Sequence, residues 1–369
     1  MQRRLLAAGL ASLLLLAAPT GAAASISPQS KNQGGTNGRV RALVIVNGVT
    51  YVGGSFTQVT DRQGHTFARK NLAAFTANGK VTGWAPRANS SVLALAVAGR
   101  TVLAGGSFTT INGNPAKGLA AINRKGRRIW GGGVRGQVRA LRFVGGRVFI
   151  GGDFTRVQGA NRHRLAAVRA GNGALTRWNP HANGPVNALA AAGKRIFAGG
   201  SFTSIGGHPV RFLVDLSQTT GRHVPFAQPR NPITALAFGT HLFTAASGPG
   251  GRIAAYNLAG KRVWLHLTDG SSAAITVAKN QVVYGGHFNN ICSGNTGGGN
   301  PFTCTTNIPR RHLLAVRPSD GKLLAWAPQV NSQLGVFAAR TGTSRVWVGG
   351  DFTSIGPATR NHLASFLYS

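Results

Sequence analysis

Acidic residues are scarce in this chain, which has six aspartates and no glutamate among its 369 residues. The six are Asp61, Asp153, Asp215, Asp269, Asp320 and Asp351. No two of them are close in sequence. This spacing disfavours a glycosidase that works with paired carboxylates, and it disfavours a calcium site, which needs several carboxylate ligands.

Other catalytic and cofactor motifs are also missing. The ten histidines do not follow a metal-binding spacing. No serine stands in a nucleophile elbow, and no glycine-rich nucleotide-binding loop occurs between a strand and a helix. We therefore expect no cofactor and no metal, and the sequence assigns no catalytic residue.

Only one long apolar run is present, at the N-terminus. Residues 1–4 form a basic segment with two arginines, residues 5–18 form an apolar segment, and residues 22–24 are three alanines in front of Ser25. This order is typical of a secretory signal peptide over residues 1–24. The run is too short to span a bilayer about 30 Å thick. We expect an exported chain without a membrane span, either secreted to the extracellular space or associated with the cell envelope.

Cysteine is nearly absent as well, with only Cys292 and Cys304. In an exported protein, a pair twelve positions apart is typical of a loop disulfide rather than of a metal or redox site. We expect these two residues to be bonded and to hold one local loop.

Basic residues dominate the charge. There are 41 lysines and arginines, and the net charge is +35. Removal of residues 1–24, which hold two arginines, would leave +33. Such a field attracts polyanions, among them nucleic acid, acidic glycans and anionic wall polymers. Genome composition or an acidic habitat would explain the same excess without a binding role.

A Gly-Gly-x-Phe signature recurs along the chain. It begins at Gly53, Gly105, Gly151, Gly199, Gly285 and Gly349, and a degenerate copy begins at Ala245. The steps between copies are 52, 46, 48, 46, 40 and 64 residues. Periods of 20–50 residues predict a propeller or a solenoid. Paired glycines in a strand indicate a close approach of another chain segment.

Each repeat contains four short apolar runs bounded by turn residues, which predicts four strands. An aromatic residue marks the fourth run, at Trp84, Trp130, Trp178, Phe226, Trp264 and Trp326. We expect these rings to dock against the neighbouring repeat. The last repeat has only three runs before Ser369. Residues 26–35 occupy the register of a fourth strand, so we expect them to complete it and to close a ring.

The motif Leu-Ala-Ala-Phe-x-x-x-Gly-Lys-x-x-x-Trp at 72–84, echoed at 313–326, resembles the tryptophan-docking motif of quinoprotein-type β-propellers. The Gly-Gly-x-Phe copies resemble the delta-sixty repeat of secreted bacterial β-propellers. The resemblance covers the whole chain after residue 24 and implies a β-propeller, but it implies no activity. Quinone-dependent dehydrogenases would need a calcium ion held by acidic and amide side chains, and they commonly have adjacent cysteines. This chain has no glutamate, and its two cysteines are not adjacent.

Basic residues cluster just before the third run of the repeats. The candidate binding residues are Arg69, Lys70, Lys117, Arg162, Arg164, Arg211, Arg310, Arg311, His312 and Arg360. The loops that carry them are longest in the first repeat and in the sixth, where residues 289–310 form an insertion. Arginine is suited to bidentate recognition of carboxylates and phosphates. An arginine that recurs once per repeat would also serve to tie repeats together, and the sequence leaves both readings open.

These observations predict an all-β protein, a seven-bladed β-propeller of four-stranded blades that forms a single domain over residues 25–369. We expect a monomer that binds an anionic polymer without catalysis. The alternatives are an extracellular enzyme acting on carbohydrate or a similar substrate at one face, and a structural scaffold that docks other proteins.

Overall fold

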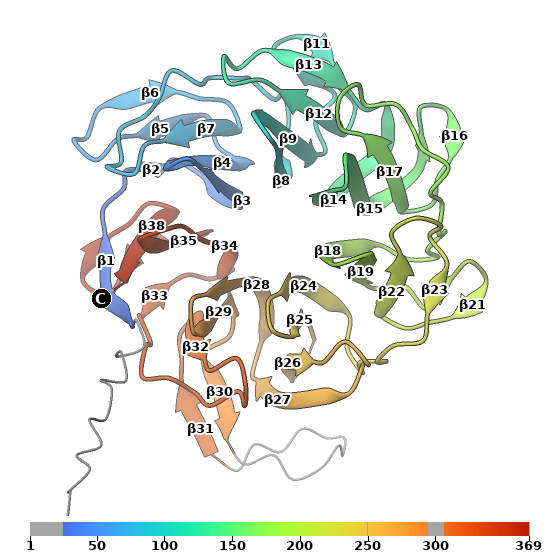
Figure 1. Cartoon of the computed structure of the whole chain (residues 1–369). Helices are drawn as coiled ribbons and strands as arrows, with labels where there is room; N and C mark the ends of the chain where they lie inside the picture. The colour runs from blue at the N-terminus through green and yellow to red at the C-terminus, as the bar shows by residue number, and fades with distance from the viewer. Residues whose placement is uncertain (1–24, 249, 294–305, 369) are drawn as a thin grey trace, which may run out of the picture.

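The computed structural model describes residues 25–248, 250–293 and 306–368, and every element assigned within them is a β-strand. Antiparallel sheets follow one another around a central axis (Figure 1). The innermost strands are β3 (Arg39–Val46), β8 (Val92–Ala98), β14 (Val134–Val144), β18 (Val186–Ala192), β24 (Ile233–Phe238), β28 (Ser271–Ala278) and β34 (Val336–Thr341). Within the described residues, no helix has the length and apolar character needed to cross a bilayer.

Each innermost strand pairs with a second strand, and that strand pairs with a third. The second strands are β4 (Val49–Ser55), β9 (Thr101–Gly106), β15 (Arg147–Val157), β19 (Arg195–Gly200), β25 (Leu242–Ala246), β29 (Gln281–His287) and β35 (Arg345–Gly350). The third strands are β7 (Leu72–Phe75), β12 (Leu119–Ile122), β17 (Leu165–Arg169), β22 (Leu213–Ser217), β26 (Gly251–Tyr256), β32 (Leu313–Val316) and β38 (Leu363–Tyr368). The signature glycines lie at or next to the end of the second strands, except in β15, which continues past Gly152 to Val157.

The fourth strands are less regular than the sequence predicts. Four sheets have one: β13 (Arg128–Gly131), β23 (His223–Val224), β27 (Arg262–Thr268) and β1 (Ile26–Lys31). In the other three, the fourth segment is reduced to a single bridge, at Val81, Leu175 and Leu323. These three segments continue into Trp-x-Pro, at Pro86, Pro180 and Pro328. Proline has no N–H to donate to a neighbouring strand. The hydrogen-bonded pairing of these segments with the third strand therefore stays short.

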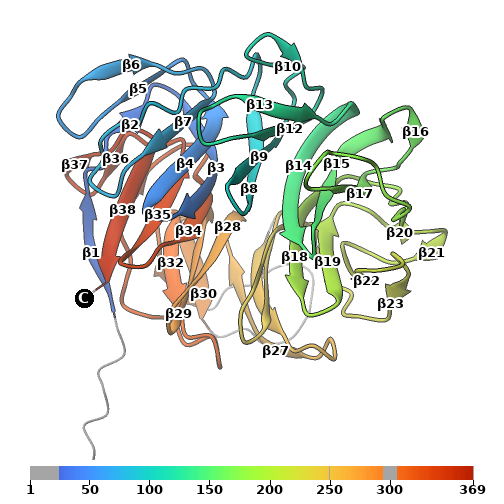
Figure 2. The same cartoon turned by 45° about the horizontal axis from the view of Figure 1, so that its top comes forward.

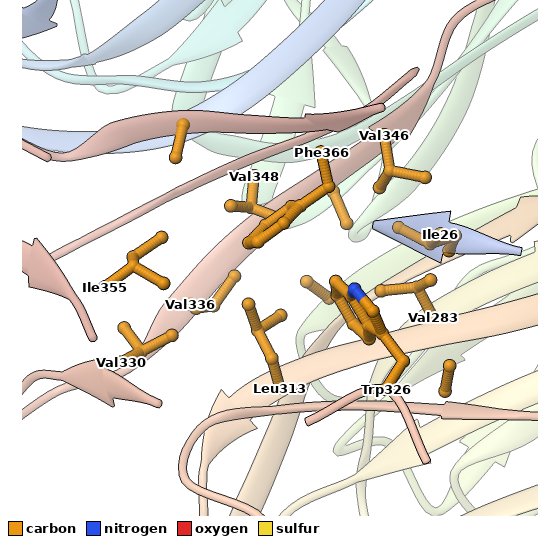
Figure 3. Packing of buried hydrophobic residues seen from close by; sticks show 14 of the residues in the cluster. Ile26, Val283, Leu313, Trp326, Val330, Val336, Val346, Val348, Ile355 and Phe366 are labelled. Carbon is orange, nitrogen blue, oxygen red and sulfur yellow. The ribbon is translucent and has the colours of Figure 1, made fainter. Parts of the chain in front are cut away.

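The N-terminal strand completes the last sheet. β1 pairs with β38, with Ile26 opposite Tyr368 and Lys31 opposite Ser365, which confirms the predicted closure. Ile26 is buried in one apolar cluster with Trp326, Val346 and Phe366 (Figure 3). Two ends of the chain that are remote in sequence are therefore held by a common core.

Steric contacts explain both signature glycines. A Cβ on the first glycine would lie 2.3–2.7 Å from a valine or isoleucine methyl group of the next sheet around the ring, as for Gly53 against Val92. A Cβ on the second would lie 2.0–2.5 Å from a carbonyl oxygen in the innermost strand or just before it, as for Gly54 against Arg39. Real Cβ atoms do not approach other atoms so closely. Each sheet can therefore sit tightly against the next.

Aromatic side chains of the fourth segments dock on the next sheet. In each of the five tryptophans of this set, the indole N–H donates to a backbone carbonyl across the junction, 2.9–3.0 Å away. The acceptors are Asn123 for Trp84, Ala170 for Trp130, Ser217 for Trp178, Pro318 for Trp264 and Ser27 for Trp326. Phe226, which has no N–H, instead lies near the ring of Tyr256.

The segments between second and third strands form small hairpins. They are built from β5 (Gln58–Thr60) with β6 (Thr66–Ala68), β10 (Thr110–Ile111) with β11 (Asn114–Pro115), the end of β15 with β16 (Ala160–Asn161), β20 (Ser204–Ile205) with β21 (His208–Pro209), β30 (Asn290–Ser293) with β31 (Thr306–Pro309), and β36 (Ser354–Ile355) with β37 (Ala358–Thr359). Two short strands, β2 (Gly35–Thr36) and β33 (Val330–Asn331), extend the β5–β6 and β36–β37 pairs. In the tilted view of Figure 2, β5, β6 and β10 lie together at the upper edge of the ring.

The predicted insertion at 289–310 contributes β30 and β31. This hairpin pairs with β27 of the preceding sheet, which thereby has six strands. Cys292 is buried in β30. Cys304 lies outside the described residues, so the pairing of the two cysteines stays a prediction.

Candidate anion-binding surface

The residue just before the third strand has a left-handed backbone in every repeat with a full signature. It is Asn71, Gly118, Arg164, Phe212, His312 and His362, with φ of 63–69°. Its N–H donates to the carbonyl of the signature phenylalanine, and its carbonyl accepts from the N–H of the second signature glycine. A left-handed residue other than glycine costs about 1–2 kcal/mol. The paired hydrogen bonds hold the backbone there and fix the basic residues beside it.

Two positions earlier, four of the predicted binding arginines make the same contact. Each guanidinium donates to the carbonyl of the preceding residue and to a carbonyl of the fourth segment of its own sheet. The four arginines and their fourth-segment acceptors are Arg69 with Thr82, Arg162 with Thr176, Arg310 with Leu324, and Arg360 with Ser30. We call these four the clamp arginines.

The clamp arginines donate hydrogen bonds to carbonyl groups of the fourth segments, where the sheets have few backbone hydrogen bonds. Three of them, Arg69, Arg162 and Arg310, belong to the sheets whose fourth segment is reduced to one bridge. The fourth, Arg360, holds the N-terminal strand. Their guanidinium groups are partly buried, and burial lowers the pKa of Arg69, Arg310 and Arg360. These contacts join strands within one sheet and therefore favour a structural role. They do not join neighbouring repeats, which was the structural role that the sequence suggested.

Four other predicted residues lie one position further along and are exposed: Lys70, Lys117, Arg211 and Arg311. No side-chain hydrogen bond or ion pair within the described residues engages them. Because the third strand begins next to each of them, they lie at one end of their sheets. We call them the rim cations.

The last two predicted residues have protein partners. Arg164 donates to the carbonyl of Ala182, and its Nε lies 3.7 Å from Oδ1 of Asp153. His312 is buried, with Nδ1 3.1 Å from the carbonyl oxygen of Gly286. Burial is the main cause that lowers the pKa of His312. It is therefore neutral near pH 7 and contributes no charge to the surface.

Few of the cations are neutralised. Asp153, Asp215, Asp320 and Asp351 each pair with one arginine, whereas Asp61 pairs with His65. Asp269 accepts the backbone N–H groups of Asn289 and Asn290. All six carboxylates of the chain lie within the described residues. Of the 39 lysines and arginines among the described residues (41 in the chain less Arg3 and Arg4), only four therefore have an aspartate carboxylate within ion-pair distance.

An axial cavity of about 160 Å³ lies between the innermost strands. Each innermost strand has a bulge at the same place, between Val40 and Ala42 in β3 and between Val138 and Ala140 in β14, for example. The bulged residues line the cavity: Arg41, Leu93, Arg139, Asn187, Thr234, Ala273 and Phe337. Bulges commonly re-aim a side chain beside a functional site.

The arginines of this cavity, Arg41, Arg139 and Arg340, are not among the residues predicted from the sequence. For Arg41 and Arg139 a signal was present: each follows the valine that packs against the first signature glycine of the preceding repeat. Arg340 lies three residues beyond the corresponding position, Phe337, and had no such signal. No cluster of three or more potential metal ligands occurs among the residues that the structure places.

No protein-family model matches the chain, and no curated protein matches it by sequence. Solved structures do match it. The WD40 β-propeller domain of Doa1 is 10% identical, with a TM-score of 0.57, covering 94% of this chain and 97% of that one. The computationally designed Ika8 protein is 14% identical, with a TM-score of 0.55, covering 91% and 98%. At these identities the likeness concerns the fold alone: this chain is an all-β protein with a β-propeller fold.

Proposed function

We propose that this protein is a seven-bladed β-propeller that binds an anionic polymer outside the cell or in the cell envelope, and that it catalyses no reaction. The blade number is supported by the seven signature copies and by their innermost strands. Export is supported by the signal-like residues 1–24. The polymer class that fits is a wall polymer, an acidic glycan or a nucleic acid.

The observation that carries the binding proposal is the unneutralised charge. In the part of the chain that the structure describes, six aspartate carboxylates face 39 lysines and arginines, and only four arginines have a carboxylate partner. Such a surface attracts a polyanion by releasing its counterions, so affinity falls steeply with salt. The rim cations are the best candidates for contact because they are exposed and their side chains are not engaged by the described residues. The clamp arginines are poorer candidates, because they already donate to the backbone.

The test is retention on immobilised heparin and on single-stranded DNA across a salt gradient. The test variant replaces Lys70, Lys117, Arg211 and Arg311 with glutamine. Its matched control replaces Arg100, Arg124, Lys194 and Lys261, two arginines and two lysines that are exposed at the opposite ends of the strands. For DNA, the rim variant is expected to lower the log–log salt slope by about one for each cation that contacts a phosphate.

Equal losses in the two variants would leave only a generally basic protein and would contradict a binding face. Retention of a neutral sugar, insensitive to salt, would favour the alternative of a carbohydrate-directed enzyme. Capture of neither polymer at low salt would contradict the proposal outright.

A further inference from the structure

The axial cavity concentrates positive charge without a matching carboxylate. Arg41, Arg139 and Arg340 line it, and no aspartate or glutamate is among the lining residues. Asp351 acts on Arg41 electrostatically, but its carboxylate already pairs with Arg39 at 2.6 Å. The charge of the lining is therefore uncompensated within the protein.

A fourth arginine adds to this field. Arg142 of β14 and Arg340 of β34 occupy corresponding places, three residues beyond the bulges at Arg139 and Phe337. Arg340 and Arg142 are both exposed at the surface, but partial desolvation by the surrounding strands lowers the pKa of each, and repulsion from Arg142 lowers that of Arg340 further. A site that holds cations against their own repulsion favours an anion between them.

The guanidinium groups are free to bind. The Nε of Arg340 donates to the carbonyl of Leu43 at 2.9 Å, which fixes the side chain and leaves its two terminal NH₂ groups. Arg41 stacks over the ring of Phe337 at 4.8 Å. Arg139 is exposed to the solvent of the channel, and no hydrogen bond to a described residue engages it. Two of the three lining arginines are thus oriented in advance by the protein.

The size of the cavity selects the ligand. Drug-sized ligands occupy about 300–1,000 Å³, whereas a cavity of about 150 Å³ accepts a molecule as small as benzene. At about 160 Å³, the cavity matches the second class. The group that lies between the arginines must therefore be small, although the cavity is open to solvent.

We propose that the axial cavity binds a small oxyanion with two or more negative charges, held by Arg41, Arg139 and Arg340 and attracted by Arg142. The ligand is a free phosphate-type or carboxylate-type anion, or the terminal group of a longer chain. This site is separate from the rim cations and does not rest on the polymer-binding function.

Titration calorimetry of the purified protein with pyrophosphate, and separately with citrate, at low ionic strength tests this. Arg139→Gln and the double variant Arg139→Gln with Arg340→Gln are compared with Arg100→Gln and the double variant Arg100→Gln with Arg124→Gln, which remove equal charge at exposed turns. Replacing a channel arginine that donates to the oxyanion is expected to weaken the affinity about tenfold or more. The turn variants should change affinity by less than threefold. The ligand that binds with the higher affinity, pyrophosphate or citrate, identifies the class of anion.

Arg340→Gln also removes the hydrogen bond to the carbonyl of Leu43, so a loss of binding in that variant could reflect misfolding. A second variant that keeps this bond is therefore needed. Ala273→Glu places a tethered carboxylate in the channel and leaves every arginine in place. It is expected to abolish anion binding and to raise the denaturant midpoint, because it neutralises the field. Binding that survives Ala273→Glu overturns the proposal, as does the absence of binding of both anions to the unaltered protein.

Heparin retention of the same variants separates this proposal from the polymer-binding function. The channel variants should elute no earlier than the turn variants. Equal loss of pyrophosphate and citrate affinity in channel and turn variants overturns the site, whatever heparin shows.

Discussion

A Cβ on Gly349 would lie 2.3 Å from Cγ1 of Val40, across the junction where the last sheet meets the first. The same relationship recurs at each full signature. At the degenerate copy, where Ala245 takes the place of the first glycine, the residue equivalent to Val40 in the next sheet is Ser272 rather than valine or isoleucine. We infer that the two positions are coupled because they share one space.

Gly349→Ala should therefore destabilise the fold by about 1–3 kcal/mol, the usual range for overpacking a core. Adding Val40→Ser should recover part of that loss, as the Ala245 and Ser272 pair suggests. Urea unfolding of the two single variants and the double variant measures the coupling. Gly83→Ala is the control, since a Cβ there meets no atom within 4 Å. Strict additivity of the two changes would refute the shared-space account.

Trp326→Phe should loosen the N-terminal strand. It removes the 3.0 Å bond from the indole N–H to the carbonyl of Ser27 and leaves that acceptor without its partner, at a cost of about 1–3 kcal/mol. Hydrogen exchange of the β1 amides should accelerate. Trp84→Phe removes the equivalent bond to Asn123 and is expected to leave β1 protected. If both variants expose β1 to the same degree, the effect is global and the local docking account is wrong.

Acidification should destabilise the protein below about pH 6.5. Burial is the main cause that lowers the pKa of His312 and of His362 from the usual 6.5. The unfolded chain then binds more protons than the folded one, so stability present above pH 6.5 is lost as the pH falls toward the folded pKa values. The double variant His312→Asn with His362→Asn should flatten this decline, because Asn71 occupies the same left-handed position in the first repeat. Urea midpoints measured from pH 8 to pH 5 test this; an unchanged slope would refute it.

Arg162→Gln should lower the stability of the fold. It should reduce polymer binding no more than the loss of any other single positive charge does. The clamp contact to Thr176 at 3.0 Å is lost, and a carbonyl in a short fourth segment loses its donor, which costs about 1–3 kcal/mol. Arg211→Gln removes the same charge in a repeat with Val210 at the clamp position, and it should leave stability within about 0.5 kcal/mol. Thermal unfolding and heparin elution of the two variants are compared. A greater loss of heparin retention in Arg162→Gln would return the clamp arginines to the binding surface.

Much of the backbone plan was legible in the sequence. Glycine pairs locate the crowded contacts, and the register of residues 26–35 predicts the strand that pairs with β38. The roles of the arginines were not legible. Arg69 and Lys70 are neighbours in the same basic run, but one reaches a carbonyl 13 residues away while the other stays exposed. A repeat pattern gives the position of a long side chain and not the acceptor at its tip.

The cavity arginines were hidden for another reason. An alternating pattern assigns each strand residue to one face, but the bulge after Val40 adds a residue and turns Arg41 toward the axis. Register slips of this kind follow from backbone packing between sheets. They become visible in a sequence only when all repeats are compared at one position.

The pairing of Ile26 with Tyr368 joins residues 342 positions apart. In loop-closure terms this is inexpensive: each doubling of a loop costs only about 0.6 kcal/mol, so spanning the whole chain costs about 2 kcal/mol more than spanning one repeat. The delay is kinetic, because contacts of long sequence separation form slowly. A chain emerging from the ribosome must leave β1 unpaired until β38 has been made. During that interval the edge of β1 and the side chain of Ile26 are accessible to other molecules. They become covered only when the six-residue strand β38 has been made and pairs with β1.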